Sequence, residues 1–63
     1  MNLTNFKEAV KARLMELTHN NTERVNRILD LRTDEIWADY MNEFSDSPEG
    51  VNAVAGGLAS GLI

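Results

Sequence analysis

The chain has 63 residues and no cysteine, which excludes a disulfide framework and a thiolate metal site. A chain of this length forms one small domain at most, and its core is marginal without self-association or a partner. The charges are sorted along the chain: residues 1–32 carry a net +2, residues 33–49 carry −6, and residues 50–63 carry none, which gives −4 in total.

A first apolar period predicts a helix over residues 5–18. Its apolar side chains recur at intervals that place them on one helical face: Phe6, Val10, Leu14 and Leu17. Asn5 and Glu8 are spaced as in a capping box, and they predict that the helix begins at Asn5. The Asn-rich residues 19–21 then indicate a turn.

A second helix is predicted over residues 22–31, with Thr22 or Asn21 as its N-cap. Its apolar face consists of Val25, Ile28 and Leu29. Glu23 precedes Arg27 in the order that favours a surface ion pair along a helix. A helix this short needs tertiary contacts to be stable.

A third helix is predicted over residues 34–44. Thr33 has the position of an N-cap, and Asp34 and Glu35 suit the helix dipole in the first turn. One side of this helix is apolar: Ile36, Trp37, Tyr40, Met41 and Phe44. We expect that side to form the centre of the core. The alternative is a hot-spot surface for a second protein, made by Trp37, Tyr40, Met41 and Phe44.

The charge-free segment begins like a helix, which we place at residues 48–60. Ser47 suits an N-cap, Pro48 suits the first helical position, and Glu49 follows. Several glycines oppose this helix, because each costs about 1 kcal/mol relative to alanine in a helix interior: Gly56, Gly57 and Gly61. We therefore expect a weak helix that is ordered by contact.

That contact has more than one candidate. Small and apolar residues of the segment recur at helical spacing and form a candidate self-association surface: Val54, Gly57, Leu58, Gly61 and Leu62. The alternatives are that the segment covers the core of its own chain, or that it is a disordered end. The expected fold class is all-α, with three amphipathic helices and a weaker C-terminal Gly/Ala-rich helix in a single domain over residues 1–63.

The third helix also carries a row of acids. Glu35, Asp39 and Glu43 recur every four residues, about 6 Å apart along a helix axis. Asp34 and Asp46 lie beside this row, and residues 33–49 contain no base that would offset it. Such a row can occupy a basic surface that normally binds nucleic-acid phosphates. The alternative is the ordinary solvated face of an amphipathic helix.

Catalysis and direct nucleic-acid binding have little support. His19 is the only histidine, and no nucleophile or phosphate-loop motif is present, so we expect no enzyme, no cofactor and no metal site. The helices at 22–31 and 34–44 have helix-turn-helix proportions, but phosphates would repel the acidic second helix. A DNA-binding regulator is therefore only a third candidate class, and an enzyme has even less support.

The sequence predicts a small acidic protein-binding module of the phage or mobile-element accessory type. Its partner would be a host protein whose basic, nucleic-acid-binding surface it occupies. The competing class is a small homo-oligomeric assembly component that uses the C-terminal apolar helix. No secretory signal is visible, and the apolar segment is shorter than the roughly 20 residues that span a bilayer. We accordingly expect a cytoplasmic protein with no membrane span.

Overall fold

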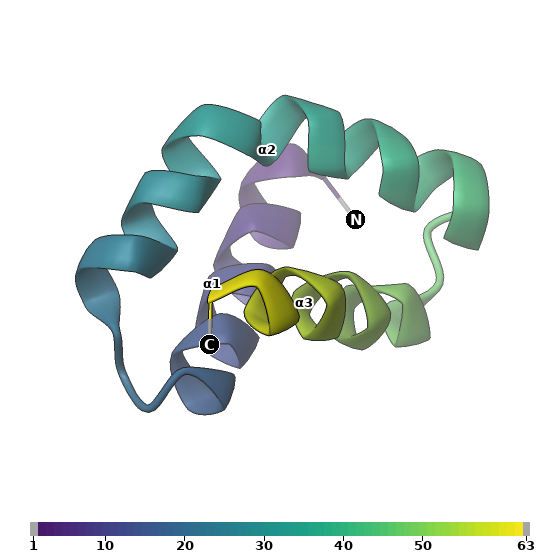
Figure 1. Ribbon diagram of the computed structural model, residues 1–63. Helices are drawn as coiled ribbons and strands as arrows, with labels where there is room; N and C mark the ends of the chain where they lie inside the picture. Colours follow the sequence, from purple (N-terminus) through teal and green to yellow (C-terminus); the bar gives the residue numbers. More distant parts are fainter. Residues whose placement is uncertain (1, 63) are drawn as a thin grey trace.

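Three helices and two short turns make up the described part of the chain, which is residues 2–62 in a computed structural model, with side chains through residue 61 (Figure 1). The helices are α1 (Leu3–Leu17), α2 (Thr22–Phe44) and α3 (Pro48–Leu62). No strand occurs among the described residues, so the all-α class is confirmed.

The first helix begins earlier than its sequence pattern predicts. Asn2 has extended backbone angles, and its side chain accepts a hydrogen bond from the Asn5 backbone N–H at 2.8 Å. Asn2 is therefore the N-cap, and the prediction that Asn5 caps the helix is wrong. Both positions hold asparagine, and the helix extends to the earlier of the two because Leu3 and Thr4 can take helical angles at little cost.

The turn after α1 closes with two left-handed residues. His19 and Asn20 have φ values of 56° and 64°. Their backbone N–H groups donate to the carbonyls of Glu16 and Met15 at 3.5 Å and 2.7 Å, which is a Schellman pattern of hydrogen bonds. The chain then enters α2, where the Asn21 side chain accepts from the Arg24 N–H at 3.5 Å, so Asn21 is the N-cap.

The predicted break between residues 31 and 34 is absent, because α2 is one helix from Thr22 to Phe44. Thr33 does not cap a new helix, and its hydroxyl instead donates to the Leu29 carbonyl one turn earlier. A threonine bonded in this way competes with the backbone ladder and bends a helix. In Figure 1, α2 changes direction part-way along its length. The helix-turn-helix pair suggested by the sequence therefore does not form.

The turn after α2 folds the chain back so that α3 lies beside α2. Ser45 and Asp46 are both left-handed, with φ values of 48° and 64°, and the Ser45 N–H donates to the Met41 carbonyl at 3.2 Å. Helix α3 begins at Pro48, which has no N–H to leave unsatisfied in the first turn.

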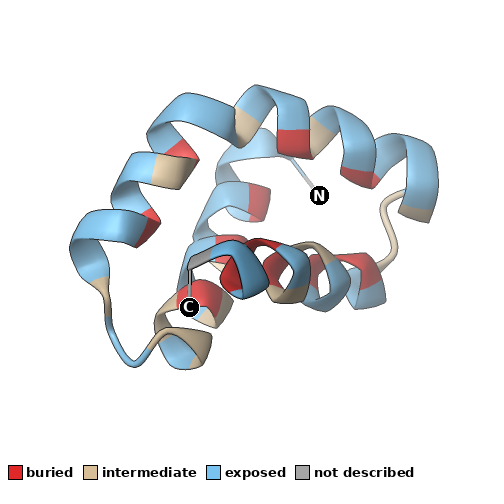
Figure 2. Ribbon diagram, in the orientation of Figure 1, coloured by how far each residue is buried: buried red, intermediate tan, exposed pale blue. Residues whose placement is uncertain are grey.

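The core lies between the three helices. Helix α1 packs against both α2 and α3, and Figure 2 shows the buried residues of α2 on the side turned toward them. The buried apolar residues are Phe6, Val10, Leu14, Val25, Leu29, Ile36, Tyr40, Val51, Ala55, Leu58 and Ala59. The Phe6 ring lies 4.6 Å from the Tyr40 ring and 5.1 Å from the Trp37 ring, so one aromatic cluster joins α1 to α2.

Gly50 permits the close approach of α3 to the end of α2. A Cβ atom at this position would lie 2.5 Å from the Phe44 Cβ and 2.9 Å from Tyr40 Cε1, which is closer than carbon atoms can pack. The other glycines of α3 have open space where a Cβ would be: Gly56, Gly57 and Gly61. Only Gly50 is thus required by packing.

Candidate functional site

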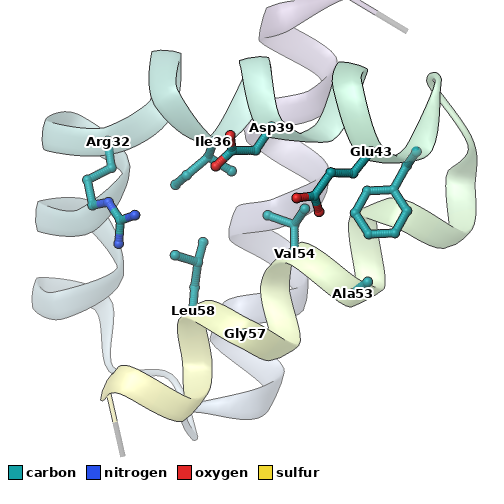
Figure 3. A pocket seen from close by; sticks show the side chains of 9 residues that line it. Arg32, Ile36, Asp39, Glu43, Ala53, Val54, Gly57 and Leu58 are labelled. Atoms are coloured by element: carbon teal, nitrogen blue, oxygen red, sulfur yellow. The ribbon is translucent and has the colours of Figure 1, made fainter.

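A groove with a volume of about 300 Å³ runs between the C-terminal half of α2 and the outer side of α3 (Figure 3). It is lined by Arg32, Ile36, Asp39, Glu43, Phe44, Ala53, Val54, Gly57 and Leu58. We call it the acidic groove. Figure 3 shows the Glu43 carboxylate extending from α2 toward Val54 of α3 and the Asp39 carboxylate lying beside Ile36, with Ile36, Val54 and Leu58 directed into the groove.

Helical spacing explains why these residues share one groove. On α2, Ile36, Asp39 and Glu43 follow each other at intervals of three and four residues and so lie along one face. On α3, Val54 and Leu58 stand four residues apart and face α2. Ile36 and Leu58 are only 4% and 9% exposed, which makes the floor of the groove part of the core's outer edge.

The charge of the groove is uneven. Arg32 pairs with Glu35 at 3.1 Å, so the base just before the acidic segment offsets the first acid of the row. Asp39 and Glu43 are exposed, and within the described residues no ion pair includes either of them. The negative charge of the acidic groove is therefore concentrated on two carboxylates beside an apolar floor.

The other two predicted acids lie elsewhere. Asp46 is part of the turn after α2, where its Oδ1 accepts a hydrogen bond from the Tyr40 hydroxyl at 3.0 Å. Asp34 lines a separate depression beside Lys7 of α1. The helix ends at Phe44, so Asp46 does not extend the row by another turn. The five predicted acids thus do not form one surface.

The aromatic side of α2 divides between core and surface. Tyr40 is fully buried, and Trp37 is partly buried with its ring 5.8 Å from the Tyr40 ring. Phe44 is partly buried and lines the acidic groove. Met41 is 41% exposed and lies at the surface. Tyr40 has a core position, and Met41 has the exposure that a contact residue needs.

The residues predicted for self-association also divide. Val54 and Leu58 pack against the core of the same chain, and Gly57 lines the acidic groove. Gly61 is exposed, and the side chain of Leu62 lies outside the described residues. The sequence suggests the acidic row and the C-terminal segment as two separate surfaces, but part of each lines the same groove: Asp39 and Glu43 from the row, and Val54, Gly57 and Leu58 from the segment.

Sequence reasoning missed a further depression, which has a volume of about 300 Å³ and lies on the N-terminal half of α2. We call it the arginine patch, and it is lined by Arg24, Arg27, Ile28, Leu31 and Arg32. Leu31 is 78% exposed. The available signal was the spacing of Arg24, Arg27 and Leu31, which places them on one helical face away from Val25 and Leu29.

The remaining observations bear on other classes of site. Among the residues that the structure describes, no three histidine or acidic side chains gather closely enough to hold a metal ion. None of the helices in residues 2–62 combines the length and the apolar character needed to cross a membrane. Comparison of the chain with protein families, curated proteins and solved structures gave no match.

Proposed function

We propose that this chain is a non-enzymatic protein-binding module whose acidic groove binds a basic surface of a partner protein. The observation that supports this most directly is the position of Asp39 and Glu43, two exposed carboxylates beside an apolar floor. In the form we favour, the partner is a nucleic-acid-binding protein, and the two carboxylates occupy the place of phosphates. The chain then acts as a small inhibitor or accessory protein.

The groove offers two kinds of contact that serve different purposes. The carboxylates favour encounter with a basic surface and select its orientation, but an exposed ion pair contributes at most about 1 kcal/mol. Affinity must come from apolar burial on the groove residues that still have exposed surface, which are Phe44, Ala53 and Val54. A partner that fits therefore presents at least one aliphatic side chain flanked by lysine or arginine.

The wall of the groove on α3 allows that partner to approach closely. Ala53 and Gly57 line it, and the space beside Gly57 is open. Residues 50–63 carry no charge, so the α3 side neither repels a basic segment nor competes for its bases. A helix or extended segment of the partner can lie along α3 with its bases toward α2.

The test uses three versions of the full chain as bait in a lysate of the native host and compares the proteins that each version retains. The wild type is set against Asp39→Asn/Glu43→Gln, which removes the two groove charges without changing side-chain shape. The control Glu8→Gln/Glu16→Gln removes two exposed acids of α1 and therefore has the same net charge as the groove variant. Mass spectrometry should identify a protein retained by the wild type and the control but lost with the groove variant.

The captured protein then enters a binding measurement with purified components. Its affinity should fall as salt rises, and nucleic acid should compete with the chain for it. Equal binding by the wild type and the groove variant contradicts the proposal. An affinity that does not change with salt also contradicts the proposal, because the groove would then make no charge contact with the partner.

A further inference from the structure

We propose that two copies of the chain associate through α2, with the arginine patch of each copy docked on the acidic groove of the other. The arginine patch contains three bases and two aliphatic side chains, and the acidic groove has two unpaired carboxylates over an aliphatic floor. Each surface therefore has the charge that the other lacks. This inference goes beyond the proposed function: a second copy and a basic partner would compete for the same acidic groove, and the dimer is tested without the partner.

The two surfaces are continuous along one helix. Arg32 lines both of them, at the centre of α2. On its N-terminal side, Arg24, Ile28 and Arg32 follow each other at intervals of four residues. On its C-terminal side, Asp39 and Glu43 are also four residues apart. The repeat along the helix axis is about 6 Å in both halves.

An antiparallel arrangement of two α2 helices brings these repeats into register. Arg24 of one copy then lies opposite Glu43 of the other, and Arg32 lies opposite Glu35. Between them, Ile28 and the neighbouring Arg27 lie opposite Asp39. A two-fold axis generates every contact twice, as in an isologous dimer. Thr33, where α2 bends, lies near the middle of this stretch, so the axis places equally bent helices against each other.

Leu31 supplies the apolar part of the contact. It is 78% exposed and lies among the bases of the arginine patch, so it is available to the aliphatic floor of the second copy's groove. The intrachain pairs of Arg27 with Glu23 at 3.4 Å and of Arg32 with Glu35 at 3.1 Å are exposed. Exposed pairs of this kind are weak and can exchange for contacts across an interface.

Net charge does not prevent this association. Each chain carries −4, but at an ionic strength of 0.1 M the Debye length is about 10 Å, which damps repulsion between the chains as wholes. Pairs in contact are screened less than distant charges. The local complementarity of the two halves of α2 therefore decides whether copies attract.

Charge reversal of each half provides the test. Arg24→Glu/Arg27→Glu makes both halves acidic, and Asp39→Lys/Glu43→Lys makes both halves basic. The first change puts acids near the N-terminus of α2 and the second puts bases near its C-terminus, so both suit the helix dipole. Matched controls with the same change in charge are Lys7→Glu/Lys11→Glu and Glu8→Lys/Glu16→Lys, which alter α1.

Sedimentation equilibrium of each purified full chain, up to about 1 mM, gives the outcome. The wild type and both controls should form a dimer, and each reversed variant alone should show a dissociation constant at least about tenfold higher. An equimolar mixture of the two reversed variants should recover a 1:1 dimer, because both sets of contacts are then attractive again. Circular dichroism and the fluorescence of Trp37 verify that each variant is folded.

Three results would overturn the proposal: a monomeric wild type throughout the concentration range, dimerisation of the reversed variants equal to wild type, or failure of the mixture to recover a dimer. If a reversed variant does not fold, two neutralising variants replace the reversed ones: Arg24→Gln/Arg27→Gln and Asp39→Asn/Glu43→Gln. Each of them must then dimerise more weakly than the wild type. Since every measurement uses pure protein, these results are independent of whether the chain captures a partner.

Discussion

The hydroxyl of Tyr40 lies 3.0 Å from Oδ1 of Asp46, and so joins the last turns of α2 to the loop that reverses the chain. The Ser47 carbonyl oxygen lies at the same distance from this hydroxyl, whose single hydrogen therefore serves two acceptors. Burial raises the pKa of Tyr40 above its ordinary value, and the hydrogen bond to Asp46 and the charge of its carboxylate raise this pKa further.

This relationship predicts how stability depends on alkaline pH. In the unfolded chain Tyr40 ionises near pH 10, and in the folded chain it ionises at higher pH. Its contribution to stability is therefore fully present below about pH 10 and is lost as pH rises through the folded pKa. Tyr40 is the only tyrosine, so ultraviolet titration of the phenolate reads the folded pKa directly.

The control for that prediction is Tyr40→Phe. We expect its melting temperature to lie below that of the wild type at pH 7, because the loop loses its hydrogen bond. The difference should narrow above about pH 10, where the Tyr40 hydroxyl of the unfolded wild type ionises and lowers the free energy of the unfolded state. A constant difference across this pH range, or a phenolate titration at the ordinary pKa, would contradict the prediction.

Gly50→Ala should destabilise the fold. The new methyl group would meet the Phe44 Cβ, which is attached to the backbone and cannot rotate away. We expect the free energy of unfolding to fall by about 1–3 kcal/mol, as in overpacked cores. Gly56→Ala is the matched control in the same helix: its methyl group meets open space, and it should raise the free energy of unfolding by up to about 1 kcal/mol. Urea unfolding measures both.

Thr33→Ala distinguishes a helix interior from a helix start. If Thr33 were an N-cap, its loss would cost about 1 kcal/mol. Because it lies inside α2, we expect a change of less than about 0.5 kcal/mol in the free energy of unfolding. Asn21→Ala is the comparison, because Asn21 does cap α2 and its loss should cost about 1 kcal/mol.

Relief of the left-handed turns should stabilise the protein. His19 and Ser45 have positive φ, a conformation that costs a side-chain-bearing residue about 1–2 kcal/mol and glycine nothing. Part of this gain is offset because glycine loses more chain entropy on folding. We therefore expect His19→Gly or Ser45→Gly to raise the free energy of unfolding by about 0.5–1 kcal/mol, as measured by thermal unfolding. Thr18→Gly, at a φ of −104°, lacks this relief and should lower stability.

The elements that depend on local patterns could be predicted from the sequence. The apolar period of α1 identified Phe6, Val10 and Leu14, and all three are buried. Pro48 marked the start of α3 because a proline suits that position in any context. The aromatic side of α2 indicated the core, and Tyr40 lies within it.

Other signals were local but ambiguous. Thr33, Asp34 and Glu35 form a helix start by composition, yet the same residues can continue a helix when both of its halves bury apolar side chains. Leu29 and Ile36, on either side of the expected break, are both buried against the same core. Tertiary burial on both sides thus outweighed the capping preference, and the competing hydroxyl of Thr33 left a bend instead of a turn.

The sequence by itself determined the helical class, the sorting of charge along the chain and the carboxylates of residues 33–49, because each depends on neighbours within a few positions. Only the tertiary structure decided what those charges face. The turn at Ser45 and Asp46 folds α3 against α2 and so combines Asp39 and Glu43 with Val54 and Leu58 in one groove. That combination depends on two left-handed residues and on the close contact at Gly50, and neither feature can be predicted from helical periodicity.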